Sequence, residues 1–158
     1  MRLERPLPPN SVIGILGGGQ LGRMLALAAA RLGLKCHIYA PEKDSPAFQV
    51  AAAHTCATYD DRTALEAFAA AVDVVTYEFE NVPAETAAIL GRLKPLAPGA
   101  EALATSQDRF VEKTFLTRIG LETAPFAAVD DEAGLERAVA RIGRPSILKT
   151  RRFGYDGK

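Results

Sequence analysis

The sequence has 158 residues, of which 48% are hydrophobic, and its 19 Lys and Arg residues balance its 19 Asp and Glu residues. A balanced charge lacks the basic excess that nucleic-acid backbones attract, and no apolar run approaches the length of a membrane span, so we expect neither partner. The polar, proline-rich residues 1–10 lack the apolar core of a secretory signal. Cys36 and Cys56 are far apart without metal-ligand spacing, which indicates two buried, reduced thiols and a cytoplasmic protein.

A glycine-rich stretch follows the first apolar run. Residues 12–16 form this run, three glycines come next, and a helix is expected over residues 21–32. The spacing is G-x-G-x-x-G, with Gly17 suited to a tight turn, Gly19 to the approach of a ligand and Gly22 to close helix packing. The helix start leaves free N–H groups beyond the strand. The pattern predicts a ligand-facing strand–helix unit, with a tight turn that binds nothing as the alternative.

The rest of the first half alternates between strands and helices. Apolar and β-branched runs predict further strands over residues 35–39, 54–58 and 72–79. Helices are expected over residues 63–71, after an Asp60 or Asp61 cap, and over residues 84–93, after Pro83. This alternation predicts an α/β fold, a doubly wound parallel sheet of the Rossmann-like kind covered on both faces.

The pattern changes at residues 94–99, where two prolines and a glycine indicate a boundary. We therefore predict a first domain over residues 1–97 and a second over residues 98–158. In the second, helices are expected over residues 108–119, capped by Ser106, and over residues 132–142, ended by Gly143; strands are expected over 125–129 and 146–150. Because so few elements make a poor core, we expect the second domain to be incomplete.

Two loops lie beyond the predicted strand ends of the first domain, where open α/β sheets bind ligands. One is the glycine loop, in which Gln20 is the longest polar side chain. The other contains Glu78 and Glu80, which point to one side if the chain is extended. A carboxylate there can accept protons from a ligand amine or hydroxyl, and two solvated loop acids are the alternative.

A nicotinamide dinucleotide is the less favoured ligand. Such a site expects an acid at the end of the second strand, but here the strand ends in Tyr39-Ala40-Pro41 and Glu42 follows only after the proline. Leu21 and Arg23 are also bulky for a loop that must contact a pyrophosphate. An NAD(P)-dependent oxidoreductase is therefore kept as an alternative.

The end of the chain predicts a second site. Lys149 lies on a predicted strand, and Gly154 and Gly157 follow in a basic loop. A strand lysine together with a glycine loop rich in N–H groups suits a polyphosphate, and Arg109 can add charge. No G-x-x-x-x-G-K-[ST] sequence is present. The alternative is that these side chains are solvated at the surface.

Four stretches, in order along nearly the whole chain, resemble the start of the carboxyaminoimidazole ribonucleotide synthetases, ATP-grasp enzymes of purine (IMP) biosynthesis. The stretches are Gly14 to Met24, Thr76 to Pro83, Gln107-Asp108-Arg109 with Lys113, and Lys149 to Lys158. The resemblance implies a carbon–nitrogen ligase that uses ATP and bicarbonate to carboxylate 5-aminoimidazole ribonucleotide, releasing ADP and phosphate. It also implies a homodimer, and Mg²⁺ held by residues beyond this chain.

The same resemblance implies the site residues. The ATP-binding residues would be Arg109, Lys149, Gly154, Tyr155, Asp156, Gly157 and Lys158. The residues facing the ribonucleotide would be Gly19, Gln20, Leu21, Glu78, Tyr155 and Lys158. No catalytic residue and no metal ligand is assigned. Because the family continues past this loop, we expect the isolated chain to show weak nucleotide affinity and no turnover, and a non-catalytic nucleotide-binding module is a further alternative.

Overall fold

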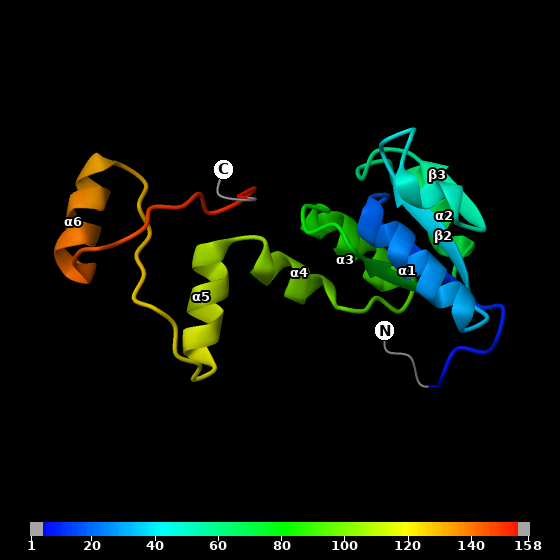
Figure 1. Cartoon of the computed structure of the whole chain (residues 1–158), viewed down its shortest axis with the longest axis horizontal. Coiled ribbons are helices and arrows are strands. Elements are labelled where there is room, and N and C mark those ends of the chain that lie inside the picture. The colour runs from blue at the N-terminus through cyan, green and yellow to red at the C-terminus, as the bar shows by residue number, and fades with distance from the viewer. Residues whose placement is uncertain (1–4, 155–158) are drawn as a thin grey trace. The chain divides into compact units, whose positions relative to one another are not determined.

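The computed structural model describes residues 5–154, and the chain divides into two compact units between Leu103 and Ala104 (Figure 1). The elements of the first unit are β1 (Val12–Leu16), α1 (Gln20–Arg31), β2 (Lys35–Ala40), the 3₁₀ turn η1 (Pro46–Gln49), β3 (Ala53–Cys56), α2 (Arg62–Ala70), β4 (Val74–Tyr77) and α3 (Ala84–Leu93). Helix α4 (Ala100–Ser106) contains the division point. The second unit holds α5 (Arg109–Arg118) and α6 (Glu132–Ile142).

The four strands form one parallel sheet in the order β3-β2-β1-β4. Ile15 in the centre of β1 is opposite Ile38 of β2 and Thr76 of β4. After β3 the chain crosses to the other side of β1, so the strand order reverses between β1 and β4. The prediction of a doubly wound α/β fold is confirmed, and this reversal is where such sheets bind ligands.

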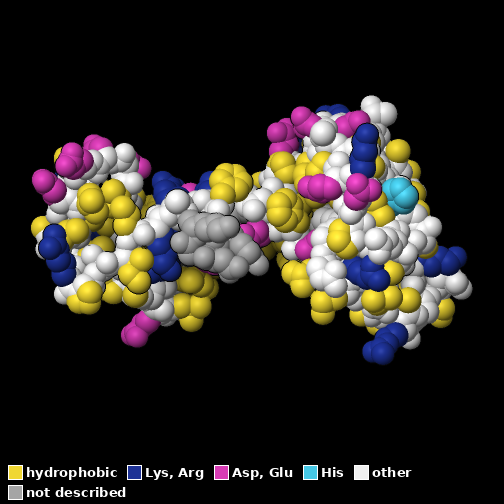
Figure 2. Space-filling view, turned by 45° about the horizontal axis from the view of Figure 1, so that its top comes forward, with side chains coloured by type: hydrophobic (Ala, Val, Ile, Leu, Met, Phe, Trp, Pro, Cys, Tyr) yellow, Lys and Arg dark blue, Asp and Glu magenta, His cyan; other side chains and the backbone are white. Residues whose placement is uncertain are grey.

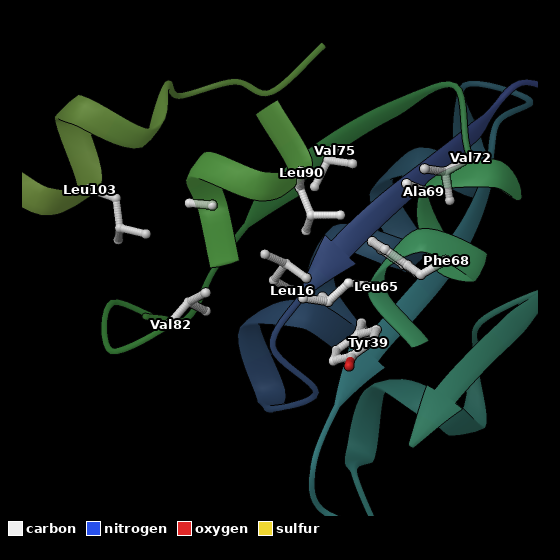
Figure 3. Packing of buried hydrophobic residues seen from close by; sticks show 11 residues of the cluster. Leu16, Tyr39, Leu65, Phe68, Ala69, Val72, Val75, Val82, Leu90 and Leu103 are labelled. Atoms are coloured by element: carbon white, nitrogen blue, oxygen red, sulfur yellow. The ribbon is translucent and has the colours of Figure 1, made fainter. Parts of the chain in front are cut away.

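Neighbouring residues of each strand point to opposite faces of the sheet, and each face has its own core. Ile15 and Ile38 pack with Ala26 and Ala29 of α1 on one face. Leu16 and Tyr39 belong to the other cluster, together with residues of α2, α3 and α4. Figure 3 shows this second cluster, whose buried members are Leu16, Tyr39, Leu65, Phe68, Ala69, Val72, Val75, Val82, Ala87, Leu90 and Leu103. Two covered faces explain why the strands read as nearly continuous apolar runs.

Polar groups inside the first unit have partners. The Tyr39 hydroxyl donates to the Thr58 carbonyl at 2.7 Å, and burial, with smaller effects of Asp61 and Asp60, raises the pKa of Tyr39 to about 12. Cys36 is buried and its burial raises the pKa of the thiol. The expectation of two buried thiols is wrong for Cys56, which is exposed because it ends the edge strand β3.

Residues 95–97 run beside β4. The Val75 N–H donates to the Pro95 carbonyl at 2.8 Å, and the Ala97 N–H donates to the Val75 carbonyl at 3.0 Å. The stretch expected to be a linker therefore extends the sheet by a single bridge, from Val75 to Leu96. The functional domain boundary after residue 97 stays a prediction.

Helix α5 of the second unit begins one residue later than expected and has a different cap. The Asp108 carboxylate, not Ser106, accepts hydrogen bonds from the N–H groups of Phe110 at 2.9 Å and Val111 at 3.1 Å. An acid directly before the first helical residue satisfies otherwise unpaired N–H groups and interacts favourably with the helix dipole. Asp131 caps α6 in the same way, and Gly143 ends that helix as predicted.

The strands predicted over residues 125–129 and 146–150 are not formed. Both segments are β-compatible, but neither pairs with a strand within residues 5–154, and a strand exists only through its ladder partners. Ile147 is consequently 81% exposed. Hydrophobic side chains reach the surface of both units, between charged ones (Figure 2). Within the described residues, no helix has the length and apolar character needed to cross a bilayer.

Candidate functional site

The glycine loop lies at the carboxyl end of β1, next to the end of β4 across the point where the strand order reverses. Gly17 continues the sheet by donating its N–H to the Tyr39 carbonyl at 2.9 Å, and it has a positive φ of 114°. Glu78 directly follows β4 and donates its N–H to the Leu16 carbonyl at 3.0 Å. The two loops that the sequence singled out are therefore adjacent.

The Glu78 side chain packs onto the glycine loop. Its Oε1 accepts a hydrogen bond from the Gly19 N–H at 3.1 Å. A Cβ atom built on Gly17 would lie 2.6 Å from the same oxygen, and one on Gly22 would lie 2.7 Å from the Gly17 carbonyl oxygen. Gly17 therefore has no room for a side chain beside Glu78, and Gly22 has none beside the backbone of the loop. The sequence motif thus has an internal explanation as well as a ligand-facing one.

This contact determines which ligands suit the loop. The N-terminal end of a helix attracts anions through its free N–H groups, and here the Glu78 carboxylate already occupies that position beside Gly19. A dinucleotide pyrophosphate at this position would meet a like charge. A ligand amine or hydroxyl would instead meet a hydrogen-bond acceptor, so the geometry favours a proton-donating ligand group.

The predicted ribonucleotide-facing residues come together at this end of the sheet. Gln20 is the first residue of α1, directly after the Gly19 N–H, and both Gln20 and Leu21 are exposed. Glu78 is half-buried beside them. The structure thus gathers Gly19, Gln20, Leu21 and Glu78 around one loop, and their contact with a ligand stays a prediction.

A second support of the glycine loop comes from a short helical turn, which the sequence predicts around residues 47–51 without indicating its contact with the loop. The η1 turn packs beneath the loop, where the Ala47 N–H donates to the Gly18 carbonyl at 2.9 Å. Arg23, which had counted only as a bulky loop residue, donates to Gln49 Oε1 at 2.5 Å. A side chain at Gly18 would clash with the buried Ser45. The signal available in the sequence was the Ser45-Pro46 pair, since proline favours the first position of a helical turn.

Tyr59 lies near two carboxylates. Burial raises the pKa of Tyr59 strongly, and the nearby Glu42 and Glu78 carboxylates raise it further. The phenol therefore stays neutral.

The second unit contains a cleft of about 810 Å³ formed by α5, α6 and the two extended segments. Its basic lining residues are Arg109, Lys113, Arg144, Lys149 and Arg151. Lys113 donates to the Ala124 carbonyl at 3.3 Å and lies 5.4 Å from the centre of the Phe126 ring. Arg109 and Lys149, two of the three cations assigned to ATP, line this same cleft. A basic cleft with aromatic walls is suited to an anionic ligand with a flat apolar group.

The loop after Lys149 is bound to the start of α5. The Arg151 guanidinium donates to both Asp108 carboxylate oxygens, at 2.7 Å from Nη2 to Oδ2 and at 3.0 and 3.2 Å from Nε. Arg152 donates to Gln107 Oε1 at 3.0 Å, and Arg109 donates to the Gly154 carbonyl at 3.2 Å. The arginine pair is therefore not simply solvated.

Asp108 is the functional candidate that the sequence reasoning left without a role. The Arg151 hydrogen bond, and then the Val111 and Phe110 N–H groups, hold the pKa of the Asp108 carboxyl below its usual range against the opposing effect of burial. The preference of Asp for the position before a helix was a signal that could have identified it as the cap. Its pairing with Arg151 spans 43 residues, and no local pattern indicates such a contact.

Tyr155, Asp156, Gly157 and Lys158 lie outside the described residues. Gly154, the last residue described, has its carbonyl bonded to Arg109, and a Cβ there would lie 2.8 Å from Thr150 Oγ1. Among residues 5–154 no three His, Cys, Asp or Glu side chains are grouped to hold a metal ion.

A doubly wound parallel sheet with a glycine loop at its point of reversal, followed by a second unit with a basic cleft, defines a two-unit α/β protein. A family model described as "Ribonucleotide synthetase preATP-grasp domain" matches residues 11–107, and one described as "ATP-grasp domain" matches residues 114–158. The chain belongs to the ribonucleotide synthetase preATP-grasp family, which confirms the resemblance seen in its motifs.

Curated relatives and solved structures agree with this assignment. The N5-carboxyaminoimidazole ribonucleotide synthase of Brucella melitensis is 55% identical over 96% of this chain and 42% of its own length. An ADP complex of an N5-carboxyaminoimidazole ribonucleotide synthetase superposes with a TM-score of 0.93 at 43% identity, covering 99% of this chain and 41% of that one. The Aspergillus clavatus synthase in complex with ADP and 5-aminoimidazole ribonucleotide superposes with a TM-score of 0.77 at 31% identity. The match covers 86% of this chain and 37% of that one. The chain spans about two fifths of the relatives it matches.

Proposed function

We propose that this chain supplies part of the ribonucleotide site and part of the ATP site of an N5-carboxyaminoimidazole ribonucleotide synthetase. The observation that carries the proposal is the 55% identity with the Brucella synthase over 96% of the chain. The Aspergillus structure supports both ligands, since it is described as holding ADP and 5-aminoimidazole ribonucleotide. The proposed reaction takes ATP, bicarbonate and aminoimidazole ribonucleotide to the N-carboxylated ribonucleotide, ADP and phosphate.

The chemistry requires two steps in one enclosed place. Bicarbonate is a poor electrophile, so an oxygen of bicarbonate first attacks the terminal phosphorus of ATP, and ADP leaves. The amine of the ribonucleotide then forms a C–N bond to the carboxyphosphate carbon, or to CO2 released from it, and phosphate leaves while the amine loses a proton. Both intermediates react with water, so the site must exclude it. No residue is assigned to the proton transfer.

For the ribonucleotide we propose contacts with Gly19, Gln20, Leu21 and Glu78. The support is the geometry at the reversal of the sheet, where Glu78 presents a carboxylate beside the first turn of α1. One carboxylate oxygen is bonded to Gly19, and we assign the other to a proton of the ribonucleotide. The Glu78 carboxylate itself disfavours a phosphate at this position, which leaves the amine or the ribose hydroxyls of the ligand to face it.

For ATP we propose that Arg109 and Lys149 bind the phosphates from the walls of the cleft, next to the Gly154 turn. Tyr155, Asp156, Gly157 and Lys158 remain assigned to ATP, and Tyr155 and Lys158 also to the ribonucleotide, from the family motif alone. Four further points also remain proposals: a domain boundary between residues 97 and 98, a homodimer, a cytoplasmic location, and Mg²⁺ held by residues beyond Lys158.

The proposal is tested by titrating the chain separately with ATP, aminoimidazole ribonucleotide and NADH, using calorimetry. We expect heat of binding from the first two ligands and none from NADH. Replacing Lys149 with Ala should weaken ATP binding by about tenfold or more, as expected for the loss of a charged hydrogen bond, and leave ribonucleotide binding unchanged. Glu78→Gln should weaken ribonucleotide binding and leave ATP binding unchanged.

The matched controls are Lys94→Ala and Glu66→Gln. Lys94 follows α3 outside both sites, and Glu66 forms an exposed ion pair with Arg62. Neither substitution should alter either affinity by more than about twofold, because surface pairs contribute little. Binding of NADH alone, or equal losses in the controls, would contradict the proposal.

A further inference from the structure

One carboxylate in the second unit joins two segments that are far apart in the sequence. Asp108 Oδ1 accepts the N–H groups of Phe110 and Val111, and both of its oxygens accept hydrogen bonds from Arg151. The side chain is only 12% exposed. A single group therefore starts α5 and at the same time holds the chain that follows Lys149.

The neighbours of Asp108 repeat the connection. The Arg109 N–H donates to the Arg151 carbonyl at 3.0 Å, its guanidinium donates to the Gly154 carbonyl, and Gln107 accepts from Arg152. The Arg151 guanidinium also lies 5.3 Å from the centre of the Phe110 ring. We call residues 107–109 and 151–154, joined in this way, the clasp. Each residue of the first segment is bonded to the second.

Of the cations that line the cleft, the clasp engages Arg151 and leaves Lys149 exposed. Arg151 is engaged by a bidentate carboxylate, a geometry that uses the planar fork of its guanidinium. It is therefore a poor candidate for binding phosphate itself. Lys149 is exposed and forms no ion pair within residues 5–154, and it lies two residues before the point that Asp108 holds. The clasp therefore fixes the chain two residues after Lys149.

We propose that Asp108 is a positioning residue of the ATP-phosphate site, which acts through Arg151 to hold Lys149 and the Gly154 turn at the cleft. The inference rests on the proposed function, because it assumes that the cleft binds ATP. The direction in which ATP affinity changes when the Asp108 charge is removed distinguishes this role from a purely electrostatic effect. An acidic side chain near a phosphate site should by simple electrostatics weaken binding, so removing its charge should tighten it. The positioning role predicts a loss instead.

The test compares Asp108→Asn with Asp131→Asn in the full 158-residue chain. Asn caps helices about as well as Asp, so α5 should persist, as checked by circular dichroism. Asp131 is a matched control, because it caps α6 by accepting the Gly134 N–H at 2.6 Å. Within residues 5–154 its ion pair is with Arg137, an exposed side chain 3.9 Å away. We expect Asp108→Asn to weaken ATP binding by about tenfold and to speed amide hydrogen exchange at residues 151–154. Asp131→Asn should change neither.

A double-mutant cycle with Arg151→Gln separates positioning from a general loss of structure. If Asp108 acts through Arg151, the double variant should bind ATP less than twofold more weakly than Arg151→Gln alone. Full additivity of the two losses, or unchanged or tighter ATP binding in Asp108→Asn, would overturn the positioning role while the proposed function stands. A wild-type chain that does not bind ATP would instead contradict the proposed function.

Discussion

The two units of this chain are held together in different ways. In the first, a parallel sheet is covered on both faces, and side chains such as Leu16, Tyr39 and Phe68 are almost fully buried. In the second, residues 104–154 bury only Gln107, Asp108, Gly134 and Ala138. The first unit therefore depends on hydrophobic burial, whereas the second depends on caps and on the clasp. A ligand site can be preformed in the first, but the cleft of the second depends on a few polar contacts.

This difference has an energetic consequence. Burial of apolar surface stabilises by roughly 25 cal/mol per Å², and an exposed side chain contributes little of this. The second unit leaves Ile147, Leu148 and Phe153 largely exposed. Its segments should open more readily than the sheet.

The largest expected difference between the units comes from the same substitution made in each. Phe68→Ala should reduce the free energy of unfolding of the first unit by about 3–5 kcal/mol, because the ring is 1% exposed and contacts both His37 and Tyr39. Phe153→Ala, at a ring 73% exposed, should change stability by less than about 0.5 kcal/mol. Urea unfolding followed by circular dichroism measures both. Equal effects would contradict the contrast between a packed and an open unit.

The glycine loop offers the next largest effect. Gly17→Ala should cost about 1–3 kcal/mol, because Gly17 has a positive φ and its new Cβ would lie 2.6 Å from Glu78. Gly120→Ala shares the positive φ, at 83°, but has open space around it. It should therefore cost less, through backbone strain alone. The same unfolding measurement distinguishes them, and an equal loss would show that the contact with Glu78 is unimportant.

A cap in the first unit tests whether local polar contacts matter beside a large core. Asp61 accepts the Ala64 N–H at 2.9 Å at the start of α2. Asp61→Ala should lower stability by about 1 kcal/mol, while Asp61→Asn, which keeps the acceptor, should change it little. If both variants match the wild type in thermal unfolding, the sheet alone determines the stability of the first unit.

The smallest expected effect is a pH dependence from His37. Burial, and then the nearby His54, lower the pKa of His37, whose Nε2 is 2.8 Å from Thr55 Oγ1. Because the unfolded chain binds a proton more readily, stability should fall as pH drops below the model-peptide pKa of about 6.5, and it should stop falling below the native pKa. Calorimetric scans between pH 7.5 and pH 5 measure this slope. His37→Gln should reduce the slope, and an unchanged slope would assign it to other groups.

The local sequence pattern was sufficient to predict a structural feature wherever the residues that determine it lie within one short stretch. The apolar runs predicted all four strands within two residues of their observed ends. The cap of α2, expected at Asp60 or Asp61 and found at Asp61, and the Gly143 helix end needed no knowledge of the rest of the chain. Glu78 was identified as a candidate because its position after a strand places it at the ligand edge of any parallel sheet. Each of these inferences rests on backbone geometry or side-chain period, which are properties of neighbouring residues.

Contacts between distant residues were beyond such reasoning. The hydrogen bond from Gly19 to Glu78 spans 59 residues, and the bond from Arg151 to Asp108 spans 43. The segments at 125–129 and 146–150 have strand-like sequences but no ladder partner, so their β-propensity stayed without effect. The residues alone thus specified the elements of the sheet and the family. Folding in three dimensions decided that the helix start meets a carboxylate and that Asp108 anchors the basic loop, because charge pairing depends on distance in space.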